Sequence, residues 1–293
     1  MMFDTFGIFG KYNGIQCWDT IDKLVQHLHA QNKTVYLDSA SCHDFPQTRY
    51  NIDIIDRNQM AKQIDVAIVV GGDGTFLDVA RSIVDQQIPI LGINLGRLGF
   101  LTDISPKDML NTLDEMMQGS YEAEERNLIR VTIYKGDEKL FDQLAFNDVV
   151  IHKTESPRMI EFETFVDSRF LNSQRSDGMI ISTPTGSTAY ALSAGGPILD
   201  PSLDVLSLVS INPHTMSTRP YVVSGNSEIE LRPHPDHCHG TAHIICDGQV
   251  SYTIAAGYRT CVTRHQNFIK MLHPKGHDHF ELLRAKLHWG DKL

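Results

Sequence analysis

Residues 64–75 read Ile-Asp-Val-Ala-Ile-Val-Val-Gly-Gly-Asp-Gly-Thr, in which an apolar, β-branched run leads directly into a glycine-rich turn. Such a run is typical of a strand that is buried on both faces of a parallel sheet. On both sides of it, strand-like runs alternate with segments whose apolar residues have helical spacing. The strand-like runs are residues 7–9, 34–37, 64–70 and 88–93, and the helical segments are residues 21–28 and 76–84. This alternation predicts βαβ units and an open, mostly parallel sheet.

The second part of the chain has a different pattern. After a helical stretch at 107–118, apolar and polar residues alternate with a period of two. The strand-like runs are residues 129–134, 160–166, 227–231, 241–246 and 262–271. We therefore expect residues 103–275 to form a mainly β domain. Phe280, Leu283 and Leu287 return to helical spacing, and this helix is expected to pack back on a first domain of residues 1–102 and 276–293.

The composition is that of an ordinary globular protein. The 293 residues include 26 basic and 36 acidic side chains, which gives a formal net charge of −10. This acidic balance argues against broad binding to nucleic acid or to an anionic membrane. The longest apolar run, Val66 to Val70, is far shorter than the roughly 20 residues that cross a bilayer. We expect neither nucleic acid nor a membrane as a partner.

Two features predict a cytoplasmic protein. Five scattered cysteines without a Cys-x-x-Cys pair fit reduced thiols better than a disulfide framework. The N-terminus has an acid at Asp4 and no basic residue ahead of its short apolar patch, so it does not resemble a secretory signal.

The turn Gly71-Gly72-Asp73-Gly74-Thr75 carries the sharpest local signal. Ligands of open α/β sheets bind at the carboxyl ends of the strands, where a glycine-rich turn lets backbone N–H groups approach a phosphate. The turn is not a Walker A loop, because no Gly-Lys-Ser/Thr follows, and it lacks the dinucleotide motif Gly-x-Gly-x-x-Gly. Bare phosphate would repel Asp73, so this side chain makes sense as a base, a metal ligand or a ribose acceptor. The alternative is a plain strand-to-helix turn.

A second constellation combines Ser176-Asp177-Gly178 with the segment Thr183–Pro197, which reads Thr-Pro-Thr-Gly-Ser-Thr-Ala-Tyr-Ala-Leu-Ser-Ala-Gly-Gly-Pro. Hydroxyls, small side chains and glycines at this density expose backbone and short donors, which suits the sugar, amide or phosphate groups of a ligand. A Ser/Thr-rich turn system inside a β domain is the alternative. A serine hydrolase is disfavoured, because the chain has no Gly-x-Ser-x-Gly motif.

Taken together, the motifs resemble those of the bacterial NAD kinases over essentially the whole chain. In the family's order and spacing they are residues 71–75, 98–101, 146–148, 173–178, 183–197 and 247–249. The Thr-Pro-Thr-Gly-Ser-Thr-Ala-Tyr block is specific to that family. The Gly-Gly-Asp-Gly turn is less specific, since it also resembles diacylglycerol-type lipid kinases and phosphofructokinases.

The resemblance implies a fold and an activity. The fold is an α/β domain with an open, Rossmann-like parallel sheet, followed by a mainly β domain that binds NAD and mediates oligomerisation. The activity is ATP-dependent phosphorylation of the 2′-hydroxyl of the adenosine ribose of NAD to give NADP, with a divalent cation, Mg²⁺. Similar enzymes are homodimers or homotetramers.

The resemblance also implies roles for residues. Asp73 is the expected catalytic proton acceptor, and the turn that binds the phosphates of ATP consists of Gly71, Gly72, Gly74 and Thr75. The residues expected to bind NAD are Asp73, Gly74, Phe100, Asn147, Asp148, Arg158, Arg175, Asp177, Thr185, Thr188, Ala189, Tyr190, Ala191, Leu192, Ser193 and Gln249. Asp148 stands where the family usually has Glu, so its reach to the ribose is one methylene shorter.

Other readings stay open at this point. A lipid or sugar kinase would share the Gly-Gly-Asp-Gly turn, and a nucleotide-binding sensor would bind the ligand without turnover. The run His234–His239 could hold a metal, although a solvated hairpin loop explains it more simply. The acidic stretch 103–126 fits an exposed helix and linker better than a docking patch. No residues are assigned to a metal from the sequence.

Overall fold

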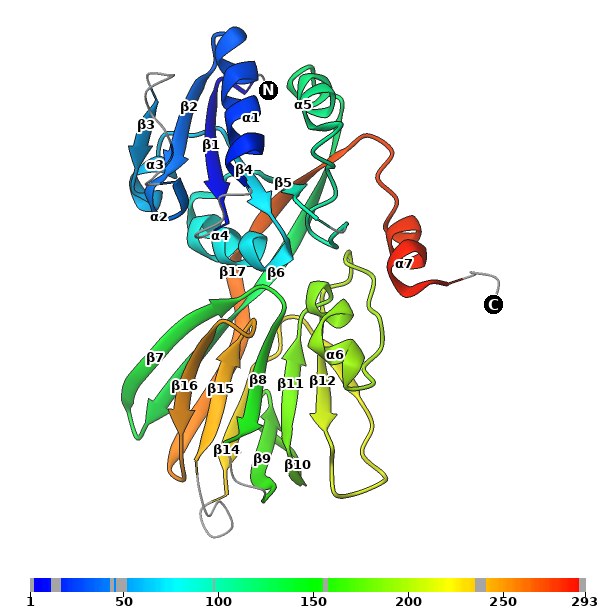
Figure 1. The fold of residues 1–293 in the computed structure, drawn as a ribbon. Helices are drawn as coiled ribbons and strands as arrows, with labels where there is room; N and C mark the ends of the chain where they lie inside the picture. The colour runs from blue at the N-terminus through cyan, green and yellow to red at the C-terminus, as the bar shows by residue number, and fades with distance from the viewer. Residues whose placement is uncertain are drawn as a thin grey trace. The chain divides into compact units, whose positions relative to one another are not determined.

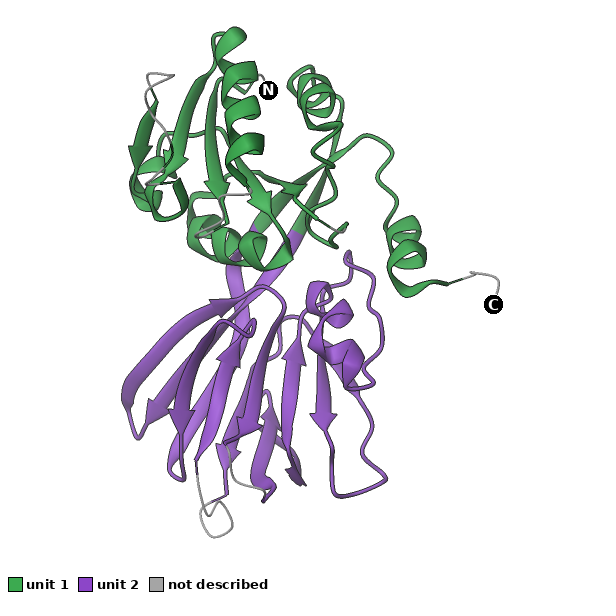
Figure 2. Cartoon of the chain, in the orientation of Figure 1, with its two compact units in different colours: residues 1–125, 269–293 green, residues 126–268 purple. Residues whose placement is uncertain are grey.

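The computed structural model describes residues 3–11, 17–42, 45, 52–96, 98–154, 158–234 and 241–289 (Figure 1). The chain forms two compact units (Figure 2). Unit 1 comprises Met1–Glu125 and Ile269–Leu293, and unit 2 comprises Arg126–Phe268. Residues 103–125 thus lie in unit 1, whereas the sequence pattern assigns them to the β domain. The reason is that Met109, Leu113 and Met116 pack into the apolar core of unit 1.

Unit 1 is built on a parallel sheet in the strand order β3-β2-β1-β4-β5, with β17 beside β5. Its strands are β1 (Thr5–Gly10), β2 (Thr34–Asp38), β3 (Asp53–Ile55), β4 (Val66–Gly71), β5 (Ile90–Asn94) and the end of β17 (Tyr258–Pro274). Its helices are α1 (Trp18–Ala30), α2 (Ser39–Cys42), α3 (Arg57–Met60), α4 (Asp73–Ile83), α5 (Met109–Met117) and α7 (His279–Leu287), and Val84–Gln86 form a 3₁₀ helix. The expected open parallel sheet is confirmed.

The hydrophobic patterns explain these elements. Strand β4 is buried along its whole length, because helices cover both faces of a parallel sheet. Its residues Val66, Ile68 and Val70 face a core shared with α1 and α5. Strand β3 was not expected from the sequence, since its three residues at the sheet edge, one exposed and two partly buried, carry no strong pattern.

Unit 2 is mainly β, as expected, and its strands pair antiparallel. One sheet has the order β13-β12-β11-β8-β15-β16, and β9, β10, β14, β6 and β7 pair around β17 in another. The strands are β6 (Tyr121–Lys135), β7 (Glu138–Ala145), β8 (Asp148–Lys153), β9 (Ile160–Val166), β10 (Arg169–Ser176), β11 (Gly178–Ser182), β12 (Val205–Ile211), β13 (Tyr221–Ser224), β14 (Ile229–Pro233), β15 (Ala242–Cys246) and β16 (Val250–Ile254). A 3₁₀ helix at Thr185–Thr188 and helix α6 (Tyr190–Ser193) follow β11.

Helix α7 and the run His234–His239 differ from the sequence-based expectations or lie beyond their test. Helix α7 belongs to unit 1 and buries Leu282 and Leu283, whereas Phe280 is 62% exposed, so Phe280 is wrongly placed on its packing face by the sequence pattern. The run His234–His239 falls largely outside the described residues, which end at 234 and resume at 241.

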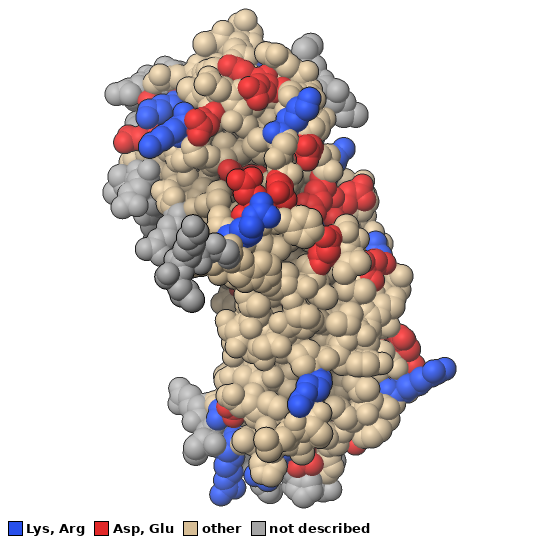
Figure 3. Space-filling view, turned by 90° about the vertical axis from the view of Figure 1, so that its right-hand side faces the viewer, with Lys and Arg blue, Asp and Glu red and all other residues tan. Residues whose placement is uncertain are grey.

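The surface carries mixed charge. On the face drawn in Figure 3, acidic side chains gather in one area and basic side chains lie more singly. Among the helices that the structure describes, none is both long and apolar enough to cross a membrane.

Candidate functional site

The glycine-rich turn lies where the strand order of unit 1 reverses. Strands β2 and β3 extend the sheet on one side of β1, and β4 and β5 extend it on the other. In open α/β sheets this reversal leaves a crevice beyond the carboxyl ends of the two central strands. Gly71 ends β4 there, Gly72 caps α4, and Asp73 is the first residue of that helix.

Asp73 is held by the loop that follows β5. One carboxyl oxygen, Oδ2, accepts a hydrogen bond from the backbone N–H of Phe100 at 2.9 Å. The other, Oδ1, accepts from the N–H of Leu101 at 3.1 Å and from the Thr102 hydroxyl at 3.2 Å. A carboxylate has about four acceptor positions, so Oδ2 can accept one further donor. The side chain is thus fixed in orientation without being saturated.

Gly99 makes this arrangement possible. A Cβ atom at this position would lie 2.1 Å from Asp73 Oδ1 and 2.5 Å from the Thr102 hydroxyl oxygen. Both distances are far inside van der Waals contact, so only glycine lets the loop close over the carboxylate. Gly72 differs, because a Cβ there would meet nothing within 4 Å. The space beside the turn is therefore open at Gly72 and filled at Gly99.

Phe100 sits at the edge of the same loop. Its ring is half-buried, and the ammonium nitrogen of Lys286 on α7 lies 5.7 Å from the ring centroid. A cation over an aromatic face is attracted by the ring quadrupole. Helix α7 thus contributes to the surroundings of a residue that the family resemblance assigns to NAD binding.

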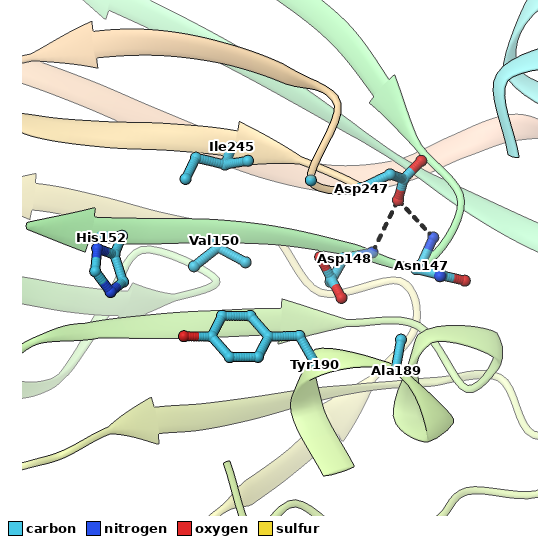
Figure 4. Close-up of a pocket in the computed structure, with 9 residues that line it drawn as sticks. Asn147, Asp148, Val150, His152, Ala189, Tyr190, Ile245 and Asp247 are labelled. Carbon is cyan, nitrogen blue, oxygen red and sulfur yellow. Dashed lines mark hydrogen bonds between the residues drawn. The ribbon is translucent and has the colours of Figure 1, made fainter. Parts of the chain in front are cut away.

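In unit 2, Asp247 organises the start of β8. Its carboxylate accepts backbone hydrogen bonds from Phe146, Asn147 and Asp148, at distances from 2.8 to 3.1 Å. Figure 4 draws the bonds from Asn147 and Asp148. Asp247 and Gly248 both have positive φ, at 49° and 66°, in the turn between β15 and β16. Asp247 belongs to the motif at 247–249, but it was not expected to be a site residue from the sequence.

The Thr183–Tyr190 segment packs against the residues that lead into β8. The Thr183 hydroxyl donates to the carbonyl of Phe146 at 2.7 Å and also bonds the carbonyl of Asn147 at 3.1 Å. A Cβ at Gly186 would lie 2.1 Å from the Asn147 carbonyl oxygen, so this contact requires glycine. The two constellations that the sequence singles out in this unit are therefore adjacent in the structure.

Between them lies a pocket of about 430 Å³, within the range of about 300 to 1,000 Å³ of small-molecule sites. Figure 4 shows the Asp148 carboxyl group and the Tyr190 ring projecting into it. The lining residues are Asn147, Asp148, Val150, His152, Ala189, Tyr190, Ile245, Asp247 and Gly248. Four of these are expected from the sequence, namely Asn147, Asp148, Ala189 and Tyr190.

Two buried polar side chains of the pocket are placed to bond a ligand. Asn147 Oδ1 is buried, and among the described residues it has no hydrogen-bond partner. The Asp148 side chain is 4% exposed, and burial, together with the nearby Asp247 carboxylate, raises its pKa to about 7. Buried polar atoms are normally bonded, so these two groups are prepared for donors from a ligand.

Three pocket residues that were not expected from the sequence lie on two neighbouring strands. Val150 and His152 lie on β8, and Ile245 lies on β15, the neighbouring strand. The His152 ring bonds the carbonyl of Lys153 through Nδ1 at 2.7 Å. Alternation along β8 from Asp148 would have placed Val150 and His152 on the same face as Asp148.

The remaining expected residues do not line this pocket. Asp177 forms an ion pair with Lys153 at 2.8 Å, and this hydrogen bond lowers its pKa. Thr185 accepts a hydrogen bond from Arg126 at 3.1 Å, and Ala191 is buried in a small apolar cluster. Arg158, Arg175, Ser193 and Gln249 are exposed, and Thr188 and Leu192 are partly buried.

The structure offers no all-oxygen cluster for Mg²⁺ within the described part of the chain. The groups with three convergent ligand atoms are Asp103 with His273 and His277, and Glu228 with Glu230 and Cys261. Both contain nitrogen or sulfur, whereas Mg²⁺ prefers oxygen and is usually held by one or two carboxylates plus the phosphates of its substrate. A magnesium ion that arrives with a nucleotide needs no such cluster.

Comparisons with known proteins agree over the whole chain. The family model described as the ATP-NAD kinase N-terminal domain matches residues 7–121, and the model of the C-terminal domain matches residues 146–273. An NAD kinase from Hydrogenovibrio crunogenus is 67% identical over 292 residues, covering 100% of both chains. An NAD kinase from Nitrosococcus oceani is 42% identical, covering 99% of this chain and 98% of its own.

Solved structures show the same fold. The yeast NADH kinase complexed with NADH superimposes with a TM-score of 0.91 at 22% identity, covering 100% of this chain and 90% of its own. An NAD kinase from Archaeoglobus fulgidus in complex with ATP has a TM-score of 0.75 at 26% identity, covering 97% of this chain and 98% of its own.

Proposed function

The chain belongs to the NAD kinase family, and from this membership we propose that it transfers the terminal phosphoryl group of ATP to the 2′-hydroxyl of the adenosine ribose of NAD, giving NADP. The ribose oxygen forms a bond to the terminal phosphorus, the bond from that phosphorus to the bridging oxygen breaks, and ADP leaves. The hydroxyl proton goes to a carboxylate. The observation that supports this reading best is the buried acceptor Asn147 Oδ1, which has no hydrogen-bond partner among the described residues and lies beside the buried Asp148 carboxyl group.

Asp73 is the proposed proton acceptor. A ribose hydroxyl is a weak nucleophile near neutral pH, and a carboxylate within hydrogen-bond reach can take its proton as the new bond forms. The three donors from the loop orient Asp73 while leaving an acceptor position on Oδ2 for the hydroxyl. Because a phosphate would be repelled by this carboxylate, simple phosphate binding does not account for an acid in this turn.

The turn before α4 is the proposed seat of the phosphates. The first backbone N–H groups of a helix lack intrahelical partners and favour anions. Gly72 leaves the approach open, since nothing stands within 4 Å of where its side chain would be. The NAD kinase from Archaeoglobus fulgidus was solved with ATP, which supports ATP as the donor here. Mg²⁺ bound to the ATP phosphates would neutralise the charge that develops during transfer.

The pocket of unit 2 is proposed to bind part of the dinucleotide. Ribose hydroxyls and the amino group of adenine are donors, and Asn147 Oδ1 and the Asp148 carboxyl are the acceptors they would meet. Val150, Ile245 and the Tyr190 ring supply apolar surface on which a flat base can lie. Hydrogen bonds from ligand hydroxyls would favour the charged form of Asp148, so bound ligand should lower the pKa of Asp148.

The proposal is tested with purified protein, NAD, ATP and magnesium. An NADP-specific dehydrogenase reads the product, and this assay detects only the 2′-phosphorylated isomer. The variant Asp73→Asn should lower kcat by about 10²- to 10⁴-fold, the usual contribution of a general base, while NAD binding measured by calorimetry stays close to that of the wild type.

Asp78→Asn is the matched control. Asp78 lies on the same helix α4, is exposed, and pairs with Arg57 and Arg81 away from the loop that holds Asp73. It should turn over normally. The proposal fails if wild-type protein makes no NADP but phosphorylates a lipid or a sugar, or if Asp73→Asn retains full turnover.

A further inference from the structure

In unit 1, two histidines converge on one buried carboxylate from a distant part of the chain. Asp103 follows the loop that holds Asp73, His273 lies near the end of β17, and His277 lies just before α7. His273 Nδ1 is 2.7 Å from Asp103 Oδ2, and His277 Nδ1 is 3.0 Å from the same oxygen. The three ligand atoms all lie within 4.8 Å of one another.

The backbone fixes the two imidazoles side by side. The N–H of His277 donates to the carbonyl of Pro274 at 3.2 Å, and Gly276 adopts a φ of +85°, which favours glycine. The N–H of Gly276 is bonded in turn to Glu122 at 2.9 Å. As a result the two rings stack with centroids 3.9 Å apart and planes at 23°. Both Nδ1 atoms are therefore presented to Asp103 by a constrained turn.

The cluster leaves buried polar atoms without partners. The side chain of His273 is 2% exposed and that of Asp103 is 9% exposed. Asp103 Oδ1 and His273 Nε2 are buried, and neither has a hydrogen-bond partner within the described part of the chain. His273 Nε2 does lie 3.4 Å from a carboxyl oxygen of Glu124. Glu124 accounts for His273 Nε2, whereas the buried oxygen Asp103 Oδ1 calls for a partner, and a bound ion would supply one.

We propose that Asp103, His273 and His277 form a binding site for a divalent transition metal, namely Zn²⁺, held by the carboxylate of Asp103 and Nδ1 of both histidines. Imidazole nitrogen and carboxylate oxygen are ordinary zinc ligands at about 2.0 to 2.2 Å, which puts two tetrahedral ligand atoms about 3.3 Å apart. The observed separations of 2.7 and 3.0 Å need to open by only a few tenths of an ångström.

The surroundings fit a metal-bound histidine. A ligating imidazole usually donates its other N–H to a carboxylate, which orients the ring, and Glu124 stands opposite Nε2 of His273.

The site is also accessible. A pocket of about 270 Å³ opens on Asp103 and His277, and its lining includes the acidic residues Asp278 and Glu281. These acids would attract a cation. The site differs from the Mg²⁺ proposed to accompany ATP, because two nitrogen ligands favour zinc over magnesium.

Metal binding here would act as a structural brace. Asp103 directly follows Thr102, whose hydroxyl bonds Asp73, and the two histidines precede α7. The ion would therefore tie the loop beside Asp73 to the C-terminal segment across 170 residues of sequence. It touches none of the groups proposed to react, so its test needs no turnover assay.

The test uses the full chain without a histidine tag, stripped of metal by a chelator. Co²⁺ serves as a spectroscopic probe, and Zn²⁺ is then added to displace it. We expect visible d–d absorption that saturates at one Co²⁺ per chain and disappears on addition of Zn²⁺. The variants His277→Gln and Asp103→Asn should each weaken binding by about 100-fold or more, since loss of an outer partner alone costs about 10- to 100-fold.

His29→Gln is the matched control, since His29 is an exposed histidine of unit 1 on α1, and it should bind like the wild type. X-ray absorption of the zinc-loaded wild type does not depend on any variant folding, and it should show two imidazole nitrogens with oxygen and no sulfur. The proposal is overturned if equilibrium dialysis finds no bound Zn²⁺ or if both ligand variants bind like the wild type. A sulfur ligand would overturn it as well, because it would place the ion elsewhere, as at Glu228, Glu230 and Cys261.

Discussion

The buried carboxyl of Asp148 should make unit 2 less stable as the pH rises. Burial and the Asp247 carboxylate raise the pKa of Asp148 to about 7 in the folded protein, against about 3.9 in an unfolded chain. Between about pH 4 and pH 7 the folded state therefore binds more protons than the unfolded state. The contribution of Asp148 to the free energy of unfolding is therefore most favourable below about pH 4. It becomes less favourable as the pH rises through this window and stays so at higher pH.

The magnitude follows from the difference in pKa. About 3 pKa units at about 1.36 kcal/mol per unit correspond to about 4 kcal/mol as an upper bound. Asn cannot ionise and has nearly the same shape. The variant Asp148→Asn should thus match the wild type near pH 4 and exceed its free energy of unfolding by up to about 4 kcal/mol near pH 8.

The assay must report on unit 2. Both tryptophans, Trp18 and Trp289, lie in unit 1, so intrinsic fluorescence does not follow this region. Amide hydrogen exchange of β8 and β11, measured across the pH range and corrected for the intrinsic rate, gives the opening free energy directly.

Asp142→Asn is the control of opposite sign. Burial alone would raise the pKa of Asp142, but hydrogen bonds from Arg130 and Lys139 outweigh it and lower the pKa. At pH values above the ordinary pKa of aspartate, the free energy of unfolding of this variant should be lower than that of the wild type by less than about 1 kcal/mol, and it should not exceed the wild-type value. The reasoning about Asp148 is refuted if Asp148→Asn shows the same stability difference from wild type at both ends of the pH range.

Two glycine substitutions separate the roles of the two units. Gly99→Ala places a methyl group on the Asp73 carboxylate, so kcat should fall about 100-fold or more. The NAD affinity measured by calorimetry should be nearly unchanged. Normal turnover would mean that the loop does not position Asp73. Gly186→Ala drives a methyl group into the Asn147 carbonyl. This should lower the free energy of unfolding by about 1 to 3 kcal/mol and weaken NAD binding. An unaltered NAD affinity in calorimetry would argue against NAD binding in the pocket of unit 2. Gly96→Ala, whose Cβ would stand 4.0 Å from its nearest neighbour, is the control for both and should leave stability and kinetics as in the wild type.

A buried strand can be predicted from the sequence, whereas the pKa of a buried side chain cannot. The run at 64–70 predicts a buried strand, and β4 occupies Val66–Gly71, because uninterrupted β-branched residues suit both faces of a covered sheet. Asp148, by contrast, appears in the sequence only as a shortened version of the usual Glu. Its raised pKa could not be foreseen, since it depends on burial by other strands and on a carboxylate 99 residues away.

The amino-acid sequence alone determined the order of the main elements, the parallel sheet with its glycine-rich turn, the mainly β second unit and the family. Each of these follows from periodicity or motifs over short stretches of the chain. Only the tertiary structure decided that Asp73 is held by the loop at 100–102, that Asp247 bonds three successive N–H groups leading into β8, and that His273 contacts Asp103. Those contacts join residues from 27 to 170 positions apart. Hydrogen bonding and desolvation act through space, and periodicity along the chain carries no information about which distant segments the fold brings together.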